Sequence, residues 1–137
     1  MPARKITVLA FDYGLRRIGV AVGNTLSNTS TPLTTLTARD GVPNWQDVAR
    51  LITEWQPTQL VVGEPLNMDG TDSDMAVNAR RFSRRLAERF ALPCELIDER
   101  LSSEEANELR QADGYQRVGL DAAAAQVILQ TWINQRP

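Results

Sequence analysis

The chain has 137 residues, of which 42 % are hydrophobic and 23 % are charged, and its formal net charge is −2. These values predict a single domain over residues 1–137 in a cytoplasmic protein, since no apolar run reaches the about 18 residues of a membrane span and no signal-peptide profile opens the chain. The chain contains no histidine and one cysteine, Cys94, which excludes Ser-His-Asp and Cys-His catalysis, histidine-bound zinc and an intrachain disulfide.

The first forty residues predict three consecutive strands. Residues 6–11 and 18–23 are apolar runs on either side of a turn over residues 12–16, which is the spacing of a hairpin. Residues 31–37 form a threonine-rich third strand, and residues 40–44 form a turn before the first helix. The chain therefore opens with a meander of strands.

Helices and buried strands alternate over the rest of the chain. Apolar residues recur at helical spacing in three segments, and the run Gln59–Gly63 has the composition of a strand buried on both faces. A capping box at residues 102–105 starts a further short helix. We expect helices over residues 45–55, 74–90, 102–113 and 119–134, and strands over residues 59–63 and 92–97. Cys94 lies in the last strand and is interpreted as a small buried hydrophobic residue, because no base is present to activate its thiol.

Acidic residues follow three of the predicted strands. A meander followed by strand–helix–strand units predicts a mixed α/β sheet, in which ligands bind at the carboxyl ends of the parallel strands. Asp12 closes the first strand, Glu64 follows the fourth, and Asp98 with Glu99 closes the fifth. We therefore expect these acids at one edge of the sheet.

The last helix adds Asp121 to this edge. Asp121 shares a helical stripe with Ala125, Ile128 and Trp132, and the alanines that follow it let the helix approach the sheet closely. Asp121 can also be interpreted as a helix-start residue favoured by the helix dipole. Acids that gather without a basic residue among them repel one another, so a divalent cation is the simplest compensation. Ligands that are all oxygen atoms favour Mg²⁺ or Mn²⁺.

Arginine supplies nearly all of the positive charge, since Lys5 is the only lysine. Arg16 and Arg17, beside Asp12, are candidate contacts for the phosphates of a nucleic acid. Arg100 follows the acids directly, and either contacts substrate or orients Asp98 or Glu99. A further group on the second helix can be interpreted as phosphate contacts or as a solvated helix face: Arg80, Arg81, Arg84 and Arg85.

Four segments, in their order and spacing, resemble the motifs of the YqgF (RuvX) family: FDYGLRRIGVAVG, VVGEPLNMDGT, IDERLSSEEA and LDAAAAQVILQ. Its members are small bacterial proteins with an RNase H-like fold, described as Holliday junction resolvases and as nucleases that mature the 5′ end of pre-16S ribosomal RNA. The resemblance implies a five-stranded mixed sheet in the order 3-2-1-4-5, with the second strand antiparallel and helices on both faces. It also implies that Asp12, the pair Asp98/Glu99 and Asp121 are the catalytic acids.

The implied activity is metal-dependent hydrolysis of phosphodiester bonds, in the processing of pre-16S rRNA during ribosome biogenesis. Asp12 would bridge two Mg²⁺ or Mn²⁺ ions, and Asp121 with one of Asp98 and Glu99 would complete the ligands; our ligand set is Asp12, Glu99 and Asp121. Glu64 stands where the family commonly has an apolar residue, and either adds a ligand or points to solvent. The segment between Asp113 and Leu120 is shorter than in relatives and carries one charge, Arg117.

The implied partner is nucleic acid, as an rRNA precursor or branched DNA, bound by a monomer or homodimer and without a membrane. Two alternatives stay open: a Holliday junction resolvase in DNA recombination and repair, for which a two-fold dimer is favoured, and a non-catalytic nucleic-acid-binding module. Actin-like proteins and sugar kinases share the opening D-x-G pattern, but they need two such domains, and the length argues against them.

Overall fold

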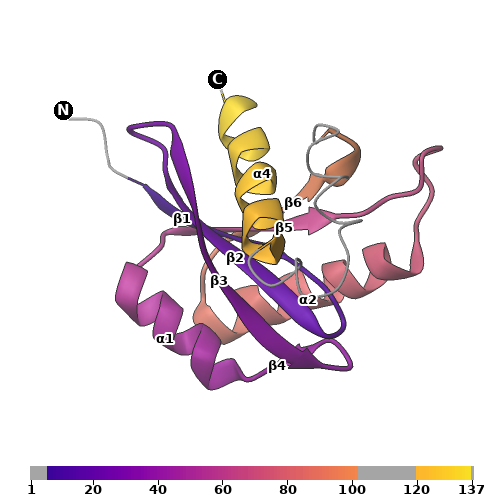
Figure 1. Ribbon diagram of the computed structural model, residues 1–137, viewed down its shortest axis with the longest axis horizontal. Helices are drawn as coiled ribbons and strands as arrows, with labels where there is room; N and C mark the ends of the chain where they lie inside the picture. Colours follow the sequence, from indigo (N-terminus) through magenta and orange to yellow (C-terminus); the bar gives the residue numbers. More distant parts are fainter. Residues whose placement is uncertain (1–5, 102–119, 137) are drawn as a thin grey trace.

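The computed structural model describes residues 6–101 and 120–136. Its strands form one sheet in the order β4-β3-β2-β1-β5-β6 (Figure 1). The strand bounds are β1 Thr7–Asp12, β2 Arg17–Asn24, β3 Thr29–Arg39, β4 Val42–Pro43, β5 Gln59–Glu64 and β6 Cys94–Asp98. β2 runs antiparallel to both β1 and β3, whereas β1, β5 and β6 are parallel to one another. The predicted order of the five long strands and the direction of the second strand are confirmed.

The sheet has a sixth strand, so the predicted count of five is wrong. β3 continues to Arg39, two residues beyond the expected end, and Asp40 and Gly41 then take positive φ angles of 50° and 80°. Two residues with positive φ make a tight hairpin turn, which folds Val42–Pro43 back against the end of β3. The predicted turn over residues 40–44 therefore contains the short strand β4.

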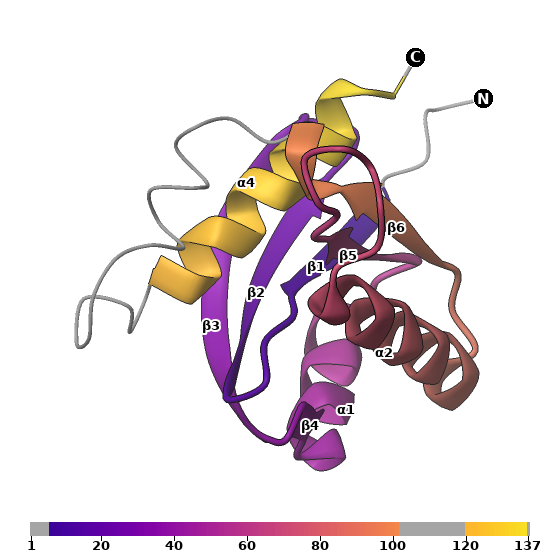
Figure 2. The ribbon, with the colours of Figure 1, turned by 90° about the vertical axis from the view of Figure 1, so that its right-hand side faces the viewer.

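Two helices cover one face of the sheet and a third covers the other (Figure 2). α1 (Trp45–Trp55) and α2 (Asp74–Phe90) lie on the first face, and α4 (Leu120–Asn134) lies on the second. The short helix η1 (Glu99–Leu101) follows β6. The predicted bounds of the three long helices hold to within a residue. The predicted helix over 102–113 and Arg117 lie outside the described residues.

Side-chain oxygens start both helices of the first face. Asn44 accepts a hydrogen bond from the backbone N–H of Gln46 at 3.0 Å at the start of α1. Ser73 accepts one from Ala76 at the start of α2, also at 3.0 Å. These bonds satisfy N–H groups that have no partner within the helix. Asn44 and Ser73 therefore determine where α1 and α2 begin. The loop after β5 ends at Ser73 for the same reason.

The strands divide the apolar core into two clusters. Leu9 and Phe11 of β1 pack with α1 and α2, whereas Val8 and Ala10 pack with α4. Successive strand residues point to opposite faces, so this division extends to the polar residues at the strand ends. None of the helices in the described part of the chain is long and apolar enough to cross a membrane.

Candidate active site

Residue alternation along β1 directs Asp12 toward α4. Val8 and Ala10 belong to the apolar cluster under α4, and Asp12 follows Ala10 by two residues, so its side chain lies on the same face. Asp12 is the last residue of β1 and lies opposite Gly19 of β2 in the antiparallel register. The α4 face of this strand therefore ends in a carboxylate.

The first turn of α4 brings Asp121 to the same place. A Cβ atom on Gly19 would lie 1.9 Å from the Asp121 carbonyl oxygen, so the helix backbone rests on β2 beside Asp12. The predicted close approach is confirmed, and Ala122 and Ala125 are buried in this contact. Asp12 and Asp121 line one pocket of about 390 Å³.

Glu99 lies on this face too. It is buried and begins η1. A Cβ atom on Gly63 of β5 would lie 2.3 Å from Glu99 Oε1 and 2.8 Å from Cδ1 of Ile128 in α4. Glu99 therefore reaches over the end of β5 beneath α4. Of the predicted pair Asp98/Glu99, it is Glu99 that shares the face of Asp12 and Asp121.

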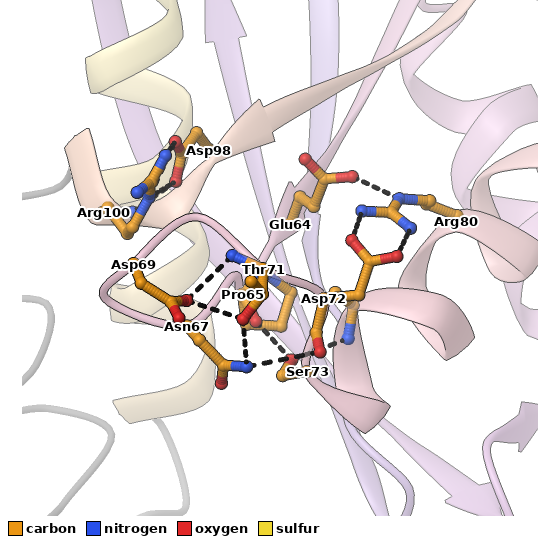
Figure 3. A network of polar contacts seen from close by, with 11 residues as sticks. Glu64, Pro65, Asn67, Asp69, Thr71, Asp72, Ser73, Arg80, Asp98 and Arg100 are labelled. Carbon is orange, nitrogen blue, oxygen red and sulfur yellow. Dashed lines mark hydrogen bonds and ion pairs between the residues drawn. The ribbon is translucent and has the colours of Figure 1, made fainter.

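Glu64 lies on the opposite face, toward α2, whereas Asp98 lies at the end of β6 beside η1. They are paired in the parallel register of β5 and β6, and each has an arginine partner (Figure 3). Arg80 of α2 donates from Nε to Glu64 Oε2 at 2.5 Å, and Arg100 donates from Nη2 to Asp98 Oδ2 at 2.7 Å. Glu64 thus takes neither of the two predicted roles in this structure, because its carboxylate points to Arg80 rather than to Asp12 or to solvent.

Hydrogen bonds organise the loop between β5 and α2 (Figure 3). Ser73 Oγ donates to the Pro65 carbonyl oxygen while it caps α2, which joins the two ends of the loop. Arg80 holds Asp72 with both Nη atoms, at 2.9 and 2.5 Å. Arg100 Nη1 donates to the Met68 carbonyl oxygen at 3.3 Å. The loop is therefore tied to α2 at one side and to η1 at the other.

These arginines hold the pKa of neighbouring carboxyl groups below the ordinary value. Hydrogen bonds from the Arg100 side chain, followed by one from its backbone N–H, lower the pKa of Asp98. A hydrogen bond from Arg80 lowers the pKa of Asp72. Both carboxyl groups therefore stay ionised to a lower pH than an unpaired carboxyl group does. Arg100 orients Asp98, which was one of the two roles predicted for it.

The expectation that no basic residue lies among the acids is wrong. Arg17 Nε donates to Asp121 Oδ2 at 2.9 Å, and the two side chains are 37 % and 20 % exposed. The reason is the alternation along β2: Arg17 precedes Gly19 by two residues and therefore points to the α4 face, where the first turn of α4 lies. Among residues 6–101 and 120–136, no three acids lie close enough together to hold one metal ion.

The predicted arginines of α2 occupy three different environments. Arg80 is held by Glu64 and Asp72. Arg81 and Arg85 are exposed and line a small pocket of about 90 Å³ beside Tyr13. Arg84 is exposed and lines neither this pocket nor the larger one. Arg16 is exposed at the rim of the larger pocket.

Tyr13 was missed by the sequence analysis. It lines both pockets, and its hydroxyl donates to the Gly41 carbonyl oxygen at 2.9 Å. Burial raises the pKa of its hydroxyl, and the charges of Arg85 and Arg81 act in the opposite direction. Its position directly after Asp12 was the available signal. Tyr13 connects the pocket of the acids with the pocket of the α2 arginines.

The family model described as RuvX, Holliday junction resolvase, matches residues 6–135. The chain belongs to the RuvX family. Two relatives are each named "Putative pre-16S rRNA nuclease". The one from Chromohalobacter salexigens is 53 % identical over 129 residues, which are 91 % of this chain and 87 % of the relative. The one from Azotobacter vinelandii is 49 % identical over 134 residues, 95 % of this chain and 94 % of the relative.

Solved structures share the fold of this RuvX-family chain. RuvC of T. thermophilus in complex with a Holliday junction substrate superposes with a TM-score of 0.54 at 14 % identity, covering 92 % of this chain and 91 % of RuvC. Fowlpox virus resolvase with Holliday junction DNA gives 0.53 at 10 % identity, with 94 % and 97 % covered. The RNase H-like fold implied by the sequence motifs is confirmed.

Proposed function

We propose that this RuvX-family protein hydrolyses phosphodiester bonds in the precursor of 16S ribosomal RNA, in the maturation of its 5′ end. The observation that carries the proposal is the arrangement of Asp12, Glu99 and Asp121 on the α4 face of the sheet, two of them lining one pocket. Relatives at 53 % and 49 % identity named for this activity support it. Glu64, paired with Arg80, and Asp98, paired with Arg100, are proposed to position the loop and η1.

The donor atoms at the site are those that hard divalent cations prefer, although no three acids of the described residues lie close enough together to hold one ion in this structure. The three carboxylates offer only oxygen ligands, and the chain has no histidine with which to favour zinc. We propose Mg²⁺ or Mn²⁺ as the cofactor, with Asp12 shared between two ions and with Glu99 and Asp121 completing the set. A bound cation of this kind lowers the pKa of water and stabilises the charge that develops on the phosphate.

The chain's own cations are proposed to bind the substrate backbone. Arg16 and Arg17 lie at the pocket of the acids, and the pocket lined by Arg81 and Arg85 adjoins it through Tyr13. Arginine side chains bind phosphates without distinguishing between base sequences. The substrate is thereby proposed to run from the acids, past Tyr13, toward the exposed arginines of α2.

Cleavage of four-way DNA junctions is the second candidate function. The description of the family model and the fold shared with RuvC favour it. It is the weaker candidate because the relatives at high identity are named for rRNA, and the structural likeness at 14 % identity concerns the fold alone. A homodimer would suit a junction, and a monomer would suit a single RNA strand.

One experiment tests the two activities together. A pre-16S rRNA fragment with a 5′ extension and a four-way DNA junction are each incubated with wild-type protein in Mg²⁺, Mn²⁺ and EDTA. We expect cleavage of the RNA in both metals and none in EDTA. Asp12→Asn should lower the rate by about 100-fold or more, because even an outer-shell partner of a metal is worth 10–100-fold. Asp47→Asn, an acid on α1 paired with Arg50, is the matched control and should keep the rate.

Three outcomes would contradict the proposal. Cleavage of the junction alone would make the protein a resolvase. Binding of either substrate without cleavage in any metal would make it a binding module. An equal rate in EDTA, or in Asp12→Asn, would remove the metal and the acids from the reaction.

A further inference from the structure

We propose that Arg17 holds the carboxylate of Asp121 when no cation is bound, and exchanges this carboxylate for a phosphate of the substrate when a cation takes Asp121. The inference rests on the proposed function, because it needs Asp121 to be a metal ligand. It assigns Arg17 a positioning role in the free protein and a binding role in the loaded one. The residue thereby links cation binding to substrate binding.

The backbones of β2 and α4 bring Arg17 and Asp121 next to each other. Arg17 opens β2 and Asp121 lies in the first turn of α4. The two backbones are fixed relative to each other at Gly19, where there is no space for a Cβ atom against the Asp121 carbonyl. A movement that separates the guanidinium of Arg17 from the carboxylate of Asp121 is therefore a movement of side chains and not of the backbones.

Arg17 is the least constrained of the three arginines that pair with carboxylates at this edge of the sheet. Arg17 contacts Asp121 through Nε only, at 2.9 Å. Arg80 binds Asp72 through both Nη atoms and Glu64 through Nε, and Arg100 contacts both oxygens of Asp98. A two-point pair fixes the geometry more firmly than a single bond. A competing cation that displaces Arg17 therefore breaks fewer hydrogen bonds than one that displaces Arg80 or Arg100.

A cation and the guanidinium compete for the same oxygen atom. Asp121 Oδ2 accepts the Arg17 bond on the wall of the pocket that Asp12 also lines. A divalent cation beside Asp12 would need that oxygen, and its charge would repel a guanidinium at hydrogen-bond distance. The displaced guanidinium remains in the pocket with Arg16, where a phosphate drawn to the cation would meet both arginines.

Nuclear magnetic resonance of the arginine Nε–H groups observes the exchange directly. The full-length wild-type protein is titrated with Mg²⁺, which is diamagnetic. We expect the Arg17 resonance to move from a hydrogen-bonded to a solvent-exposed position as Mg²⁺ binds. The Arg80 resonance should stay, because its Nε donates to Glu64 on the other face of the sheet. An unmoved Arg17 resonance at saturating Mg²⁺ would overturn the exchange.

Calorimetric titration with Mn²⁺ alone measures whether Arg17 competes with the cation for Asp121. Arg17→Gln should bind Mn²⁺ about 2- to 5-fold more tightly than Arg16→Gln, the span that corresponds to a partly exposed ion pair. Arg16→Gln removes the same charge next to the site without breaking an acid pair, so it controls for general repulsion. Arg17→Lys keeps a charge that can pair and should bind Mn²⁺ as wild type does. Equal affinities in Arg17→Gln and Arg16→Gln would overturn the competition.

The effect of the cation on substrate binding is measured with a 2′-O-methyl RNA oligonucleotide as the probe. Mg²⁺ should raise its affinity for the wild-type protein relative to EDTA, and Arg17→Gln should lose most of that gain while Arg84→Gln, at an exposed arginine that lines neither pocket, keeps it. The same gain in Arg17→Gln as in wild type would overturn the transfer to phosphate. Absence of Mn²⁺ binding in wild type and all variants would instead overturn the metal-dependent function itself, and the exchange with it.

Discussion

Asp12 lies directly opposite Gly19 in the β1–β2 register, and Gly19 is the residue on which the first turn of α4 rests. Because Gly19 has no side chain, the backbones of Asp12 and Asp121 can lie close together. The two acids are 109 residues apart in the chain (121 − 12). The site depends on this contact as much as on the acids themselves.

Gly19→Ala should destabilise the protein and move Asp121. Its Cβ atom would meet the Asp121 carbonyl oxygen at 1.9 Å and the Ala122 nitrogen at 2.9 Å, both of them backbone atoms that cannot turn aside. Overpacking costs about 1–3 kcal/mol, and we expect the upper end of that range in urea unfolding. Cleavage activity should fall together with stability. A variant as stable as wild type would show that α4 approaches β2 less closely than described.

The sequence was sufficient to predict the long elements but not the faces of all the acids. The apolar stripes of α1 and α2 recur at helical spacing, and α4 is a long apolar segment rich in alanine, so all three helices could be placed. Leu60–Gly63 is buried on both faces, so it has no alternation from which the direction of Glu64 could be predicted. The pair of Arg17 with Asp121 joins positions 104 residues apart, and it follows only once the register of β2 and the start of α4 are known.

Asp121→Asn should lower stability slightly in EDTA. Repulsion among acids alone would predict a gain, but the described structure pairs Asp121 with Arg17 at 2.9 Å. Both side chains are partly exposed, so the loss should be small, about 0.2–1 kcal/mol. Thermal melts in EDTA and in Mn²⁺ test this. Wild type should gain stability in Mn²⁺, by roughly 2.7 kcal/mol at a hundredfold excess over the dissociation constant, and the variant should gain much less.

Asp47→Asn is the control for Asp121→Asn in these thermal melts. Asp47→Asn breaks a more exposed pair with Arg50, 3.6 Å apart, and should change neither stability nor the response to Mn²⁺. A gain in stability for Asp121→Asn in EDTA would mean that repulsion exceeds the pair with Arg17. An unchanged Mn²⁺ response would mean that Asp121 acts only as a helix-start residue.

In Arg100→Gln the free energy of unfolding should decrease less between pH 7 and pH 2 than in the wild-type protein. Arg100 lowers the folded-state pKa of Asp98 below its ordinary value of 3.8. A depressed pKa gives stability that is full above the unfolded value and is lost as pH falls through the folded value. The wild-type protein should therefore lose this contribution below about pH 4, and Arg100→Gln should lack it at neutral pH. The measurement is the free energy of unfolding between pH 2 and 7; parallel curves for the two proteins would contradict the assignment.

The thiol of Cys94 should be unreactive in the folded protein. Burial raises its pKa to about 11, in spite of a hydrogen bond from Ser83 at 3.1 Å. At pH 8 the thiolate fraction is then about 100-fold lower than for a free thiol of pKa near 8.5–9. Labelling by a disulfide reagent should be slower by at least that factor than in 8 M urea. Cys94→Ala should keep cleavage activity, and loss of activity in a folded variant would mean that the thiol contributes to the site.

The α2 arginines beside Tyr13 should contact nucleic acid, whereas Arg84 should not. Arg81 and Arg85 line the pocket that adjoins the acids, and among the described residues neither forms an ion pair that would compete with a phosphate. Each lost phosphate contact reduces the slope of log affinity against log salt by about 0.7–0.9. The double variant Arg81→Ala/Arg85→Ala should therefore lower the slope by about 1.4–1.8, measured with the pre-16S rRNA fragment in EDTA. Arg84→Ala is the matched control, because it removes an exposed arginine of the same helix that lines neither pocket. If Arg84→Ala changed the slope and the double variant did not, the substrate would cross a different face of α2 and the path past Tyr13 would be wrong.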